Sequence, residues 1–380
     1  MFLMKKFSVY FFAIYLFAIL TGCGNNPGLT YTADSPNESI DMENASTNES
    51  NTEYKYIATT LEITELERGF SAVRYDGDYS FDQFLEQGGA ESDQDVLRFL
   101  TNTVFGKDYG LQMGGDAFGC STFSIKNTDG GYLFGRNFDW QACDALVVTA
   151  YPDNGYASIS TVNLDFIKQG AGFVSHFMSD EIMPVAALYA PLDGMNEKGL
   201  CVSVNMIQDG ATINQNTDKA DITTTTAIRL MLDKAATTEE ALTLLGQYDL
   251  HASMNYMIHF AIADSEGNSV AVEYIDDEMV VTETPILTNF YLAEGEKNGI
   301  GTQQSHTRFE ILTKALEEKS SMTIPEVRDT LDSVSKDNFN EYESTEWSIV
   351  FDQSEMTAVY YHREDYENGY SFKLDTSHGK

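Results

Sequence analysis

Hydrophobic and polar positions follow two different periods along this chain. Short runs in which β-branched and aromatic residues alternate with polar ones, bounded by turn residues, predict strands. They occupy residues 61–70, 145–151, 156–163, 185–188, 200–207, 256–264, 269–274, 279–284, 347–351 and 358–362. Apolar residues spaced three and four apart predict helices at residues 81–85, 96–100, 227–235, 241–245, 307–318 and 324–334, and a capping box at residues 237–240 opens the fourth of them. Residues 192–199 are expected to form a polar turn ahead of the strand at residues 200–207. Because strands and helices come in groups, an α+β fold is favoured over a parallel βαβ sheet.

The sharpest local pattern is a β-hairpin that begins at Cys120. An alternating run reaches a turn at residues 127–131, and a second run, residues 132–138, returns beside it. Antiparallel pairing brings the end of the second strand to the start of the first, so Arg136 and Asp139 should lie beside Cys120. A cationic side chain near a thiol favours the thiolate, which makes Cys120 a candidate reactive cysteine. The hairpin alone equally allows a buried structural cysteine next to an ordinary ion pair.

The residues around this cysteine also carry a family resemblance. Gly119 precedes Cys120, a serine follows it, and the hairpin closes with Gly-Arg-Asn-Phe-Asp-Trp at residues 135–140. This combination resembles the choloylglycine hydrolase and acid-ceramidase-like family of N-terminal nucleophile hydrolases, which act on linear amide C–N bonds. The resemblance implies a four-layer αββα sandwich and cleavage of the chain between Gly119 and Cys120. It also implies that Asp139 orients the new α-amine and that Arg136 places positive charge beside the sulfur.

A free α-amine would meet a chemical need of Cys120. A thiol is only a few per cent ionised at neutral pH and requires a base. The six histidines are scattered through the sequence without a local Cys/His motif. The reference pKa of an α-amine, about 7.7–8.0, suits proton transfer at neutral pH, whereas the amide of the uncut chain has no basicity. The uncut precursor should therefore be inactive.

Three positions further along also match the family. Asn205 ends a strand, Asn289 follows another, and Arg308 opens a helix. The resemblance implies that Asn205 and Asn289 help to hold the tetrahedral oxyanion, and that Arg308 is the family's second arginine. Without the resemblance they would be turn asparagines and a helix-surface arginine. The short interval between Asn289 and Arg308, and the long segment before Cys120, place the chain nearer to acid ceramidases and acyltransferases than to bile-acid hydrolases.

The N-terminal third divides by composition. Residues 1–23 are typical of a signal peptide, and their last four, Leu-Thr-Gly-Cys, resemble a bacterial lipobox with Cys23 as the lipid-bearing residue. A plain signal peptide or a short anchor helix is the alternative. Residues 24–51 are polar and predict a disordered tether. Residues 52–119 are expected to form a propeptide or an N-terminal subdomain, and residues 120–380 the catalytic amidohydrolase domain.

The net charge of the chain limits the kinds of partner that it can bind. The formal net charge of −36 argues against nucleic acid, whose phosphates need Lys and Arg contacts. It also argues against electrostatic adhesion to anionic lipid.

Cys143 and Cys201 could pair or remain free, and sequence leaves this open. His and Cys lack zinc spacing and no Gly-rich phosphate loop follows a strand, so neither metal nor cofactor is expected.

These features predict a lipid-anchored, extracytoplasmic bacterial hydrolase. It would cleave a linear, non-peptide amide of a small N-acyl substrate through a thioester acyl-enzyme on Cys120. An acyltransferase, in which an amine replaces water, is one alternative. A non-catalytic surface binding lipoprotein that kept the fold without self-cleavage is another. The identity of the substrate and the oligomeric state stay open.

Overall fold

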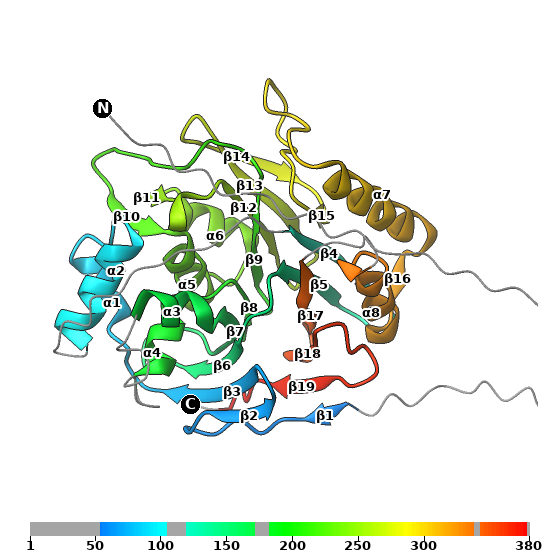
Figure 1. Ribbon diagram of the computed structural model, residues 1–380, viewed down its shortest axis with the longest axis horizontal. Coiled ribbons are helices and arrows are strands. Elements are labelled where there is room, and N and C mark those ends of the chain that lie inside the picture. The colour runs from blue at the N-terminus through cyan, green and yellow to red at the C-terminus, as the bar shows by residue number, and fades with distance from the viewer. Residues whose placement is uncertain (1–53, 105–118, 172–181, 338–342, 378–380) are drawn as a thin grey trace, which may run out of the picture. The chain divides into compact units, whose positions relative to one another are not determined.

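Two β-sheets lie face to face in this protein, and helices cover the outer side of each (Figure 1). The computed structural model describes residues 54–104, 119–171, 182–337 and 343–377. All of them fall in one unit of the chain, residues 51–380. The predicted α+β fold and its four-layer αββα arrangement are confirmed.

The first sheet is built around the predicted hairpin. In spatial order it contains β1 (Lys55–Tyr56), β19 (Tyr370–Lys373), β18 (Thr357–His362), β17 (Ser344–Asp352), β5 (Tyr132–Trp140), β4 (Gly119–Asn127) and β15 (Ile286–Leu287), with β16 (Ser321–Met322) also beside β4. The hairpin strands β4 and β5 therefore lie inside the sheet, and no edge of β5 is open because β17 pairs with its other side.

The second sheet is larger and faces the first. In spatial order it contains β14 (Glu278–Glu283), β13 (Ser269–Ile275), β12 (Ile258–Ala263), β9 (Cys201–Met206), β8 (Asp193–Asn196), β7 (Ser158–Asn163), β6 (Ala145–Tyr151), β3 (Phe70–Asp76) and β2 (Thr64–Glu67). A short parallel pair, β10 (Ala220–Thr223) and β11 (Tyr248–His251), stands apart. The two large sheets share one core, in which Trp347 and Phe351 of β17 are buried together with Ile159 of β7 and Val202 of β9.

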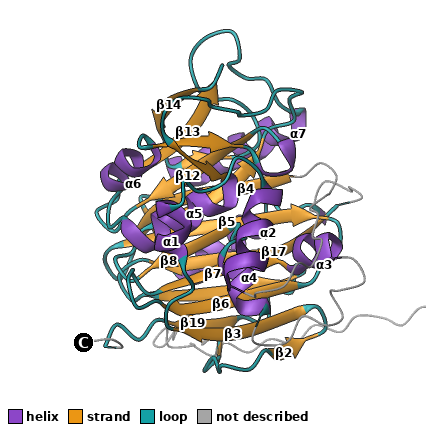
Figure 2. Cartoon of the chain, turned by 90° about the vertical axis from the view of Figure 1, so that its left-hand side faces the viewer, coloured by secondary structure: helices purple, strands orange, loops and turns teal. Residues whose placement is uncertain are grey.

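The helices divide between the two outer faces. Those on the second sheet's side are α1 (Phe81–Glu86), α2 (Asp93–Phe99), α3 (Leu164–Ala171), α4 (Met183–Leu188), α5 (Thr224–Lys234) and α6 (Thr238–Leu245), and Figure 2 shows them over the strands. Helices α7 (Gln303–Glu318) and α8 (Ile324–Asp332) pack on the first sheet. Helix α6 begins at the expected cap, since the Thr237 side chain accepts a hydrogen bond from the backbone of Glu240. None of the helices in the described ranges is long and apolar enough to cross a membrane.

Two local predictions are wrong. Residues 185–188, expected as a strand, lie in α4, where Pro184 occupies the first turn and four of the six residues have strong helix propensity. The expected polar turn at residues 192–199 contains the strand β8 instead. Its Asp193 and Asn196 are fully buried because distant groups, which the local sequence does not reveal, provide their hydrogen-bond partners.

The segment ahead of Cys120 contributes strands to both sheets. β1 pairs in parallel with β19 at one edge of the first sheet. β3 pairs in parallel with β6 over seven residues near the edge of the second. The fold of residues 120–380 therefore includes partners that come from the N-terminal side of the predicted cleavage position.

Candidate active site

The hairpin places its charged residues where antiparallel pairing predicts. Asp139 lies opposite Gly119, and Cys120 lies opposite the residue before Asp139. Arg136 is paired two positions further along, with Thr122. Cys120, Arg136 and Asp139 are all buried, with exposed fractions of 3%, 0% and 0%. The hairpin therefore gathers a thiol, a guanidinium and a carboxylate away from bulk water.

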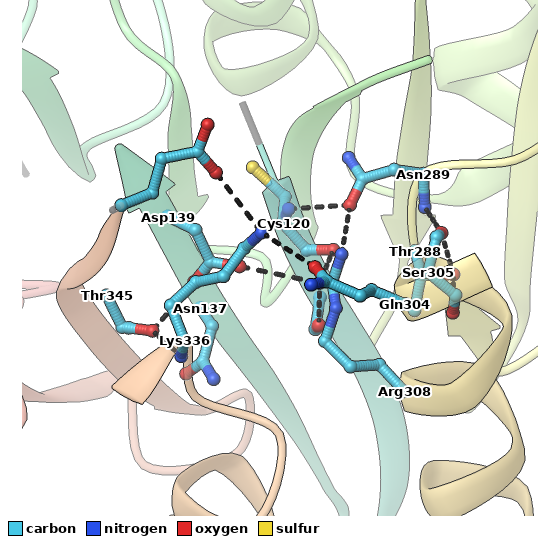
Figure 3. Close-up of polar contacts among 12 residues, drawn as sticks. Cys120, Asn137, Asp139, Thr288, Asn289, Gln304, Ser305, Arg308, Lys336 and Thr345 are labelled. Atoms are coloured by element: carbon cyan, nitrogen blue, oxygen red, sulfur yellow. Dashed lines mark hydrogen bonds and ion pairs between the residues drawn. The ribbon is translucent and has the colours of Figure 1, made fainter. Parts of the chain in front are cut away.

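Two groups from distant elements hold the backbone of Cys120 (Figure 3). Its N–H donates to Oδ1 of Asn289, just after β15, at 2.7 Å. Its carbonyl oxygen accepts from Nη1 of Arg308, in α7, at 2.6 Å. Nη2 of Arg308 also donates to Oδ1 of Asn289 at 2.8 Å, so the two side chains form one clamp. Asn289 and Arg308, predicted from the sequence, are thus in direct contact with the candidate nucleophile.

Asp139 lies on the other side of Cys120. Its Oδ1 accepts from the hydroxyl of Thr345 in β17 at 2.7 Å, and its Oδ2 is 3.4 Å from Nη1 of Arg308. Burial raises the pKa of Asp139 to about 6, although Arg308 and Lys336 favour the ionised form. In this uncut chain the nitrogen of Cys120 donates to Asn289 rather than to Asp139. The additional hydrogens that Asp139 is expected to accept exist only on a free amine.

Arg136 extends from β5 into the space between the sheets. Nη1 donates to Oδ1 of Asn205 at 2.6 Å, and Nη2 donates to the carbonyl of Val204 at 2.8 Å. Nε is 3.4 Å from Oδ2 of Asp193, which also accepts from the indole of Trp347 at 3.0 Å. The sequence did not indicate that Asp193 and Trp347 belong to the site, because Asp193 lies in a stretch that was expected to be a polar turn. Arg136 is therefore fixed by a buried carboxylate and by the strand that carries Asn205.

Asn205 and Asn289 differ in whether the amide nitrogen has a hydrogen left to donate. Nδ2 of Asn205 donates to the carbonyls of Leu287 and Thr288, at 3.2 and 3.1 Å, which uses both of its hydrogens. Nδ2 of Asn289 donates one hydrogen to the carbonyl of Met206 at 2.6 Å. The oxyanion role expected of Asn205 is thus not compatible with this arrangement, because buried donors are bonded where an acceptor lies in reach. Asn205 instead orients Arg136.

The thiol itself is not activated in the uncut chain. Burial raises the pKa of Cys120, Arg136 lowers it, and Asp139 raises it again. The net direction is upward, so the thiol carries its proton at neutral pH. A base close to the sulfur is needed before Cys120 can act as a nucleophile.

Comparison with known proteins agrees with this geometry. Residues 120–290 match the family described as linear amide C–N hydrolases, choloylglycine hydrolase family. This part of the chain, which contains the whole predicted hairpin, is therefore similar to that family. The match begins at Cys120, the first residue of the predicted catalytic domain, and includes Arg136, Asp139, Asn205 and Asn289. The protein is therefore a hydrolase that acts on linear amide C–N bonds.

Two solved structures have a similar arrangement. A mutant conjugated bile acid hydrolase from Clostridium perfringens is 18% identical, with a TM-score of 0.48 over 68% of this chain and 92% of that chain. A penicillin V acylase from Agrobacterium tumefaciens is also 18% identical, with a TM-score of 0.48 over 68% of this chain and 87% of that chain.

A small apolar pocket in this hydrolase opens beside the thiol. Its volume is about 50 Å³. It is lined by Cys120, Phe138, Trp140, Phe166, Leu192, Val204, Met206, Thr224, Thr225, Ser253, Met254, Tyr256 and Ile258. Most of these side chains are hydrocarbon or aromatic, so the pocket suits an apolar group that lies beside Cys120.

One wall of the pocket depends on the segment ahead of Cys120. Met254 and Asn255 both have left-handed backbone conformations, with φ of 55° and 58°, which are unfavourable for residues with side chains. The N–H of Met254 donates at 2.7 Å to Oδ2 of Asp93, at the start of α2. The N-terminal segment thus helps to fix the shape of the pocket.

A buried histidine supports the strand end that carries Asn289. Nε2 of His259 is 2.9 Å from the carbonyl of Thr288, and Nδ1 is 3.1 Å from Oε1 of Glu273. Glu273 also accepts from the backbone of Leu292 and Ala293. Burial raises the pKa of Glu273, but its hydrogen bond with His259 and these backbone bonds lower the pKa overall. Both ring nitrogens of His259 face oxygen acceptors. No local sequence pattern indicates this network, because its members are far apart along the chain.

The other cysteines and the possible metal ligands are the remaining candidates from the sequence. Cys143 and Cys201, whose pairing was open, are both free and buried. Cys23 lies outside the described residues. Within those residues, no three His, Cys, Asp or Glu side chains lie close enough together to hold a metal ion.

Proposed function

We propose that the protein is a cysteine N-terminal nucleophile hydrolase, formed by self-cleavage between Gly119 and Cys120. The observation that carries this proposal is the clamp on the nitrogen of Cys120, whose N–H donates to the buried Asn289 at 2.7 Å. A structural cysteine needs only packing for its side chain. Here the backbone nitrogen, the group that becomes the α-amine, lies within the same charged cluster as the thiol.

The proposed reaction uses that amine as the base. It takes the proton of Cys120 while the sulfur attacks the carbonyl carbon of the amide. Asn289 and Asp139 orient the amine, and Arg136 provides positive charge near the thiolate. The second amide hydrogen of Asn289 can donate to the oxyanion. The leaving amine takes a proton, and water then releases the acid from the thioester.

The proposed substrates are linear amides with an apolar, unbranched acyl group. The lining of the pocket is mostly apolar, and its volume of about 50 Å³ is far below the 300–1,000 Å³ typical of pockets for drug-sized ligands. A narrow chain fits such a space better than a rigid polycyclic acid. The protein should therefore hydrolyse octanoyl-p-nitroanilide faster than cholyl-p-nitroanilide.

Trapping with hydroxylamine tests the proposed function. Hydroxylamine competes with water for a thioester, so the full-length protein acting on octanoyl-p-nitroanilide should form octanoyl hydroxamate. The Cys120→Ala variant should form none. Release of nitroaniline at the same rate by both proteins would show that Cys120 is not the nucleophile.

The pH dependence of hydrolysis should reflect the ionisation of Asp139. Because burial raises the pKa of Asp139 to about 6, the carboxylate that orients the amine is protonated below that pH and ionised above it. We expect kcat/KM for octanoyl-p-nitroanilide to rise as pH increases through about 6. The Asp139→Asn variant should have much lower activity and lack this rise. An identical acid limb in the variant would assign the limb to another group.

Removal of Asp93 should affect long acyl chains selectively. The Asp93→Ala variant loses the acceptor that holds Met254 in its left-handed conformation, so the wall of the pocket should relax. We expect KM for octanoyl-p-nitroanilide to rise about tenfold, which is about 1.4 kcal/mol, with a smaller effect on acetyl-p-nitroanilide. Asp95→Ala, in the same helix turn, is the matched control. Equal effects on both substrates would contradict a role in acyl selection.

The proposed location is the outer side of a bacterial membrane, with a lipid on Cys23. This rests on the sequence of residues 1–23 alone. Self-cleavage would leave the lipid on the N-terminal chain, and β1 and β3 of that chain pair with β19 and β6. The two fragments should therefore elute together in mild detergent and separate only in denaturant. Elution of the catalytic fragment alone in mild detergent would contradict this retention.

A further inference from the structure

The side chain of Lys336 lies across the backbone at Gly119. Lys336 follows α8 and is buried, with 4% of its surface exposed. A Cβ atom placed on Gly119 would stand 2.5 Å from Cε and 2.9 Å from Nζ of Lys336, and 3.0 Å from Oδ2 of Asp139. Only a glycine leaves room for this close approach. The carbonyl carbon of Gly119 is bonded to the same Cα, so the ammonium is near the peptide group that Cys120 would attack.

Other contacts fix Lys336 in this place (Figure 3). Its Nζ is 3.1 Å from Oε2 of Glu343 and 3.4 Å from Oε1 of Gln304. Its backbone N–H donates at 2.9 Å to the hydroxyl of Thr345, which in turn donates to Asp139 at 2.7 Å. Lys336 also favours the ionised form of Asp139. The ammonium, the hydroxyl and the carboxylate thus form one connected group around Gly119.

We propose that Lys336 acts in self-cleavage, by holding Gly119 against Cys120 and placing positive charge beside the scissile peptide. This inference rests on the proposed function. In the first step the bond from Sγ of Cys120 to the carbonyl carbon of Gly119 forms, the C–N bond breaks, and the thiol proton goes to the nitrogen of Cys120. Water then hydrolyses the thioester, which leaves a carboxylate on Gly119 and restores the thiol.

The charge of Lys336 matters most in the first of these steps. Negative charge develops on the carbonyl oxygen of Gly119 as the sulfur adds, and a buried cation nearby stabilises it. Arg308 donates to the carbonyl of Cys120, and Arg136 is paired with Thr122, two residues beyond Cys120, so both contacts lie on the Cys120 side of the peptide. Lys336 is the cation that the structure places against Gly119 itself.

A time course of cleavage tests this assignment. Full-length chains made by cell-free translation are followed by gel as the intact chain converts to its fragments. We expect Lys336→Met to slow conversion about 10²-fold, as for loss of one oxyanion donor, and Lys336→Arg to slow it less. Lys319→Met, which removes a half-exposed lysine at the end of α7, should convert like the wild type.

A double-mutant cycle with Gly119 separates a direct contact from general damage. Gly119→Ala should displace the Lys336 side chain and slow cleavage even though the lysine is present. Since both changes disrupt one contact, the double variant should be no slower than the slower single variant. Conversion of Lys336→Met at the wild-type rate, or fully additive effects, would overturn the inference. If the wild type itself does not cleave, the proposed function fails instead.

Discussion

The Cys120→Ala variant is expected to lose turnover by about 10⁴-fold or more, because it lacks the atom that forms the acyl-enzyme. It should also remain uncut, since the proposed self-cleavage begins with the same sulfur. The variant should still fold, because the thiol is a small group and the backbone bonds from Asn289 and Arg308 to residue 120 do not involve it. Hydrolysis of octanoyl-p-nitroanilide and thermal unfolding measure the two properties.

Cys143→Ala provides the matched control for this loss. Cys143 is also a buried free thiol, and burial raises its pKa well above the usual range for cysteine. Its carbonyl accepts a hydrogen bond from Arg363, and its N–H donates to Glu346, so its backbone is held much as that of Cys120 is. We expect the control to keep its turnover. Loss of activity in both variants, or in neither, would contradict the assignment of Cys120 as the nucleophile.

The second large effect is expected at Arg308. This guanidinium is 1% exposed, and it contacts the carbonyl of Cys120, the hydroxyl of Ser121, Oδ1 of Asn289 and Oδ2 of Asp139. Arg308→Met removes a buried cation and leaves Asp139 without its nearest arginine. The free energy of unfolding should fall by about 3–5 kcal/mol, as for a broken buried ion pair. Turnover should fall by about 10²–10³-fold because Asn289, the partner of the Cys120 nitrogen, loses the guanidinium that holds its Oδ1.

A lysine at this position should restore little of the function. Its single ammonium carries the charge but lacks the planar set of donors that reaches several acceptors at once. Arg98→Met is the control, because Arg98 is 62% exposed and its ion pair with Asp95 lies in solvent. Urea unfolding and kcat/KM on octanoyl-p-nitroanilide distinguish the variants. Equal behaviour of Arg308→Met and Arg98→Met would contradict the role of the clamp.

The sequence could predict the hairpin and its charges because both are local. The turn and the alternation set the register of β4 and β5, and that register alone brings Asp139 beside Cys120. Asn289 and Arg308 lie far from Cys120 along the chain, and only the family resemblance pointed to them. Their place in a single clamp on the backbone of Cys120 follows from the packing of α7 and β15 against β4.

Other features depend on contacts that no local pattern records. Asp193 looked like part of a surface turn, yet Arg136 and Trp347 make it a buried strand residue. Asn205 was expected at the oxyanion, but the carbonyls of Leu287 and Thr288 take both of its hydrogens. No sequence pattern predicted a role for Lys336, because this residue comes close to Gly119 only when the segment after α8 packs on the hairpin.

Mass spectrometry of the purified full-length protein, beside its Cys120→Ala variant, tests the central claim most directly. The account predicts that the wild type alone is split, and that its C-terminal fragment begins at Cys120 with a free amine. The variant should show one intact mass. If both proteins remain whole after prolonged incubation at mildly acidic and neutral pH, Cys120 has no α-amine to serve as its base, and the proposed mechanism is wrong.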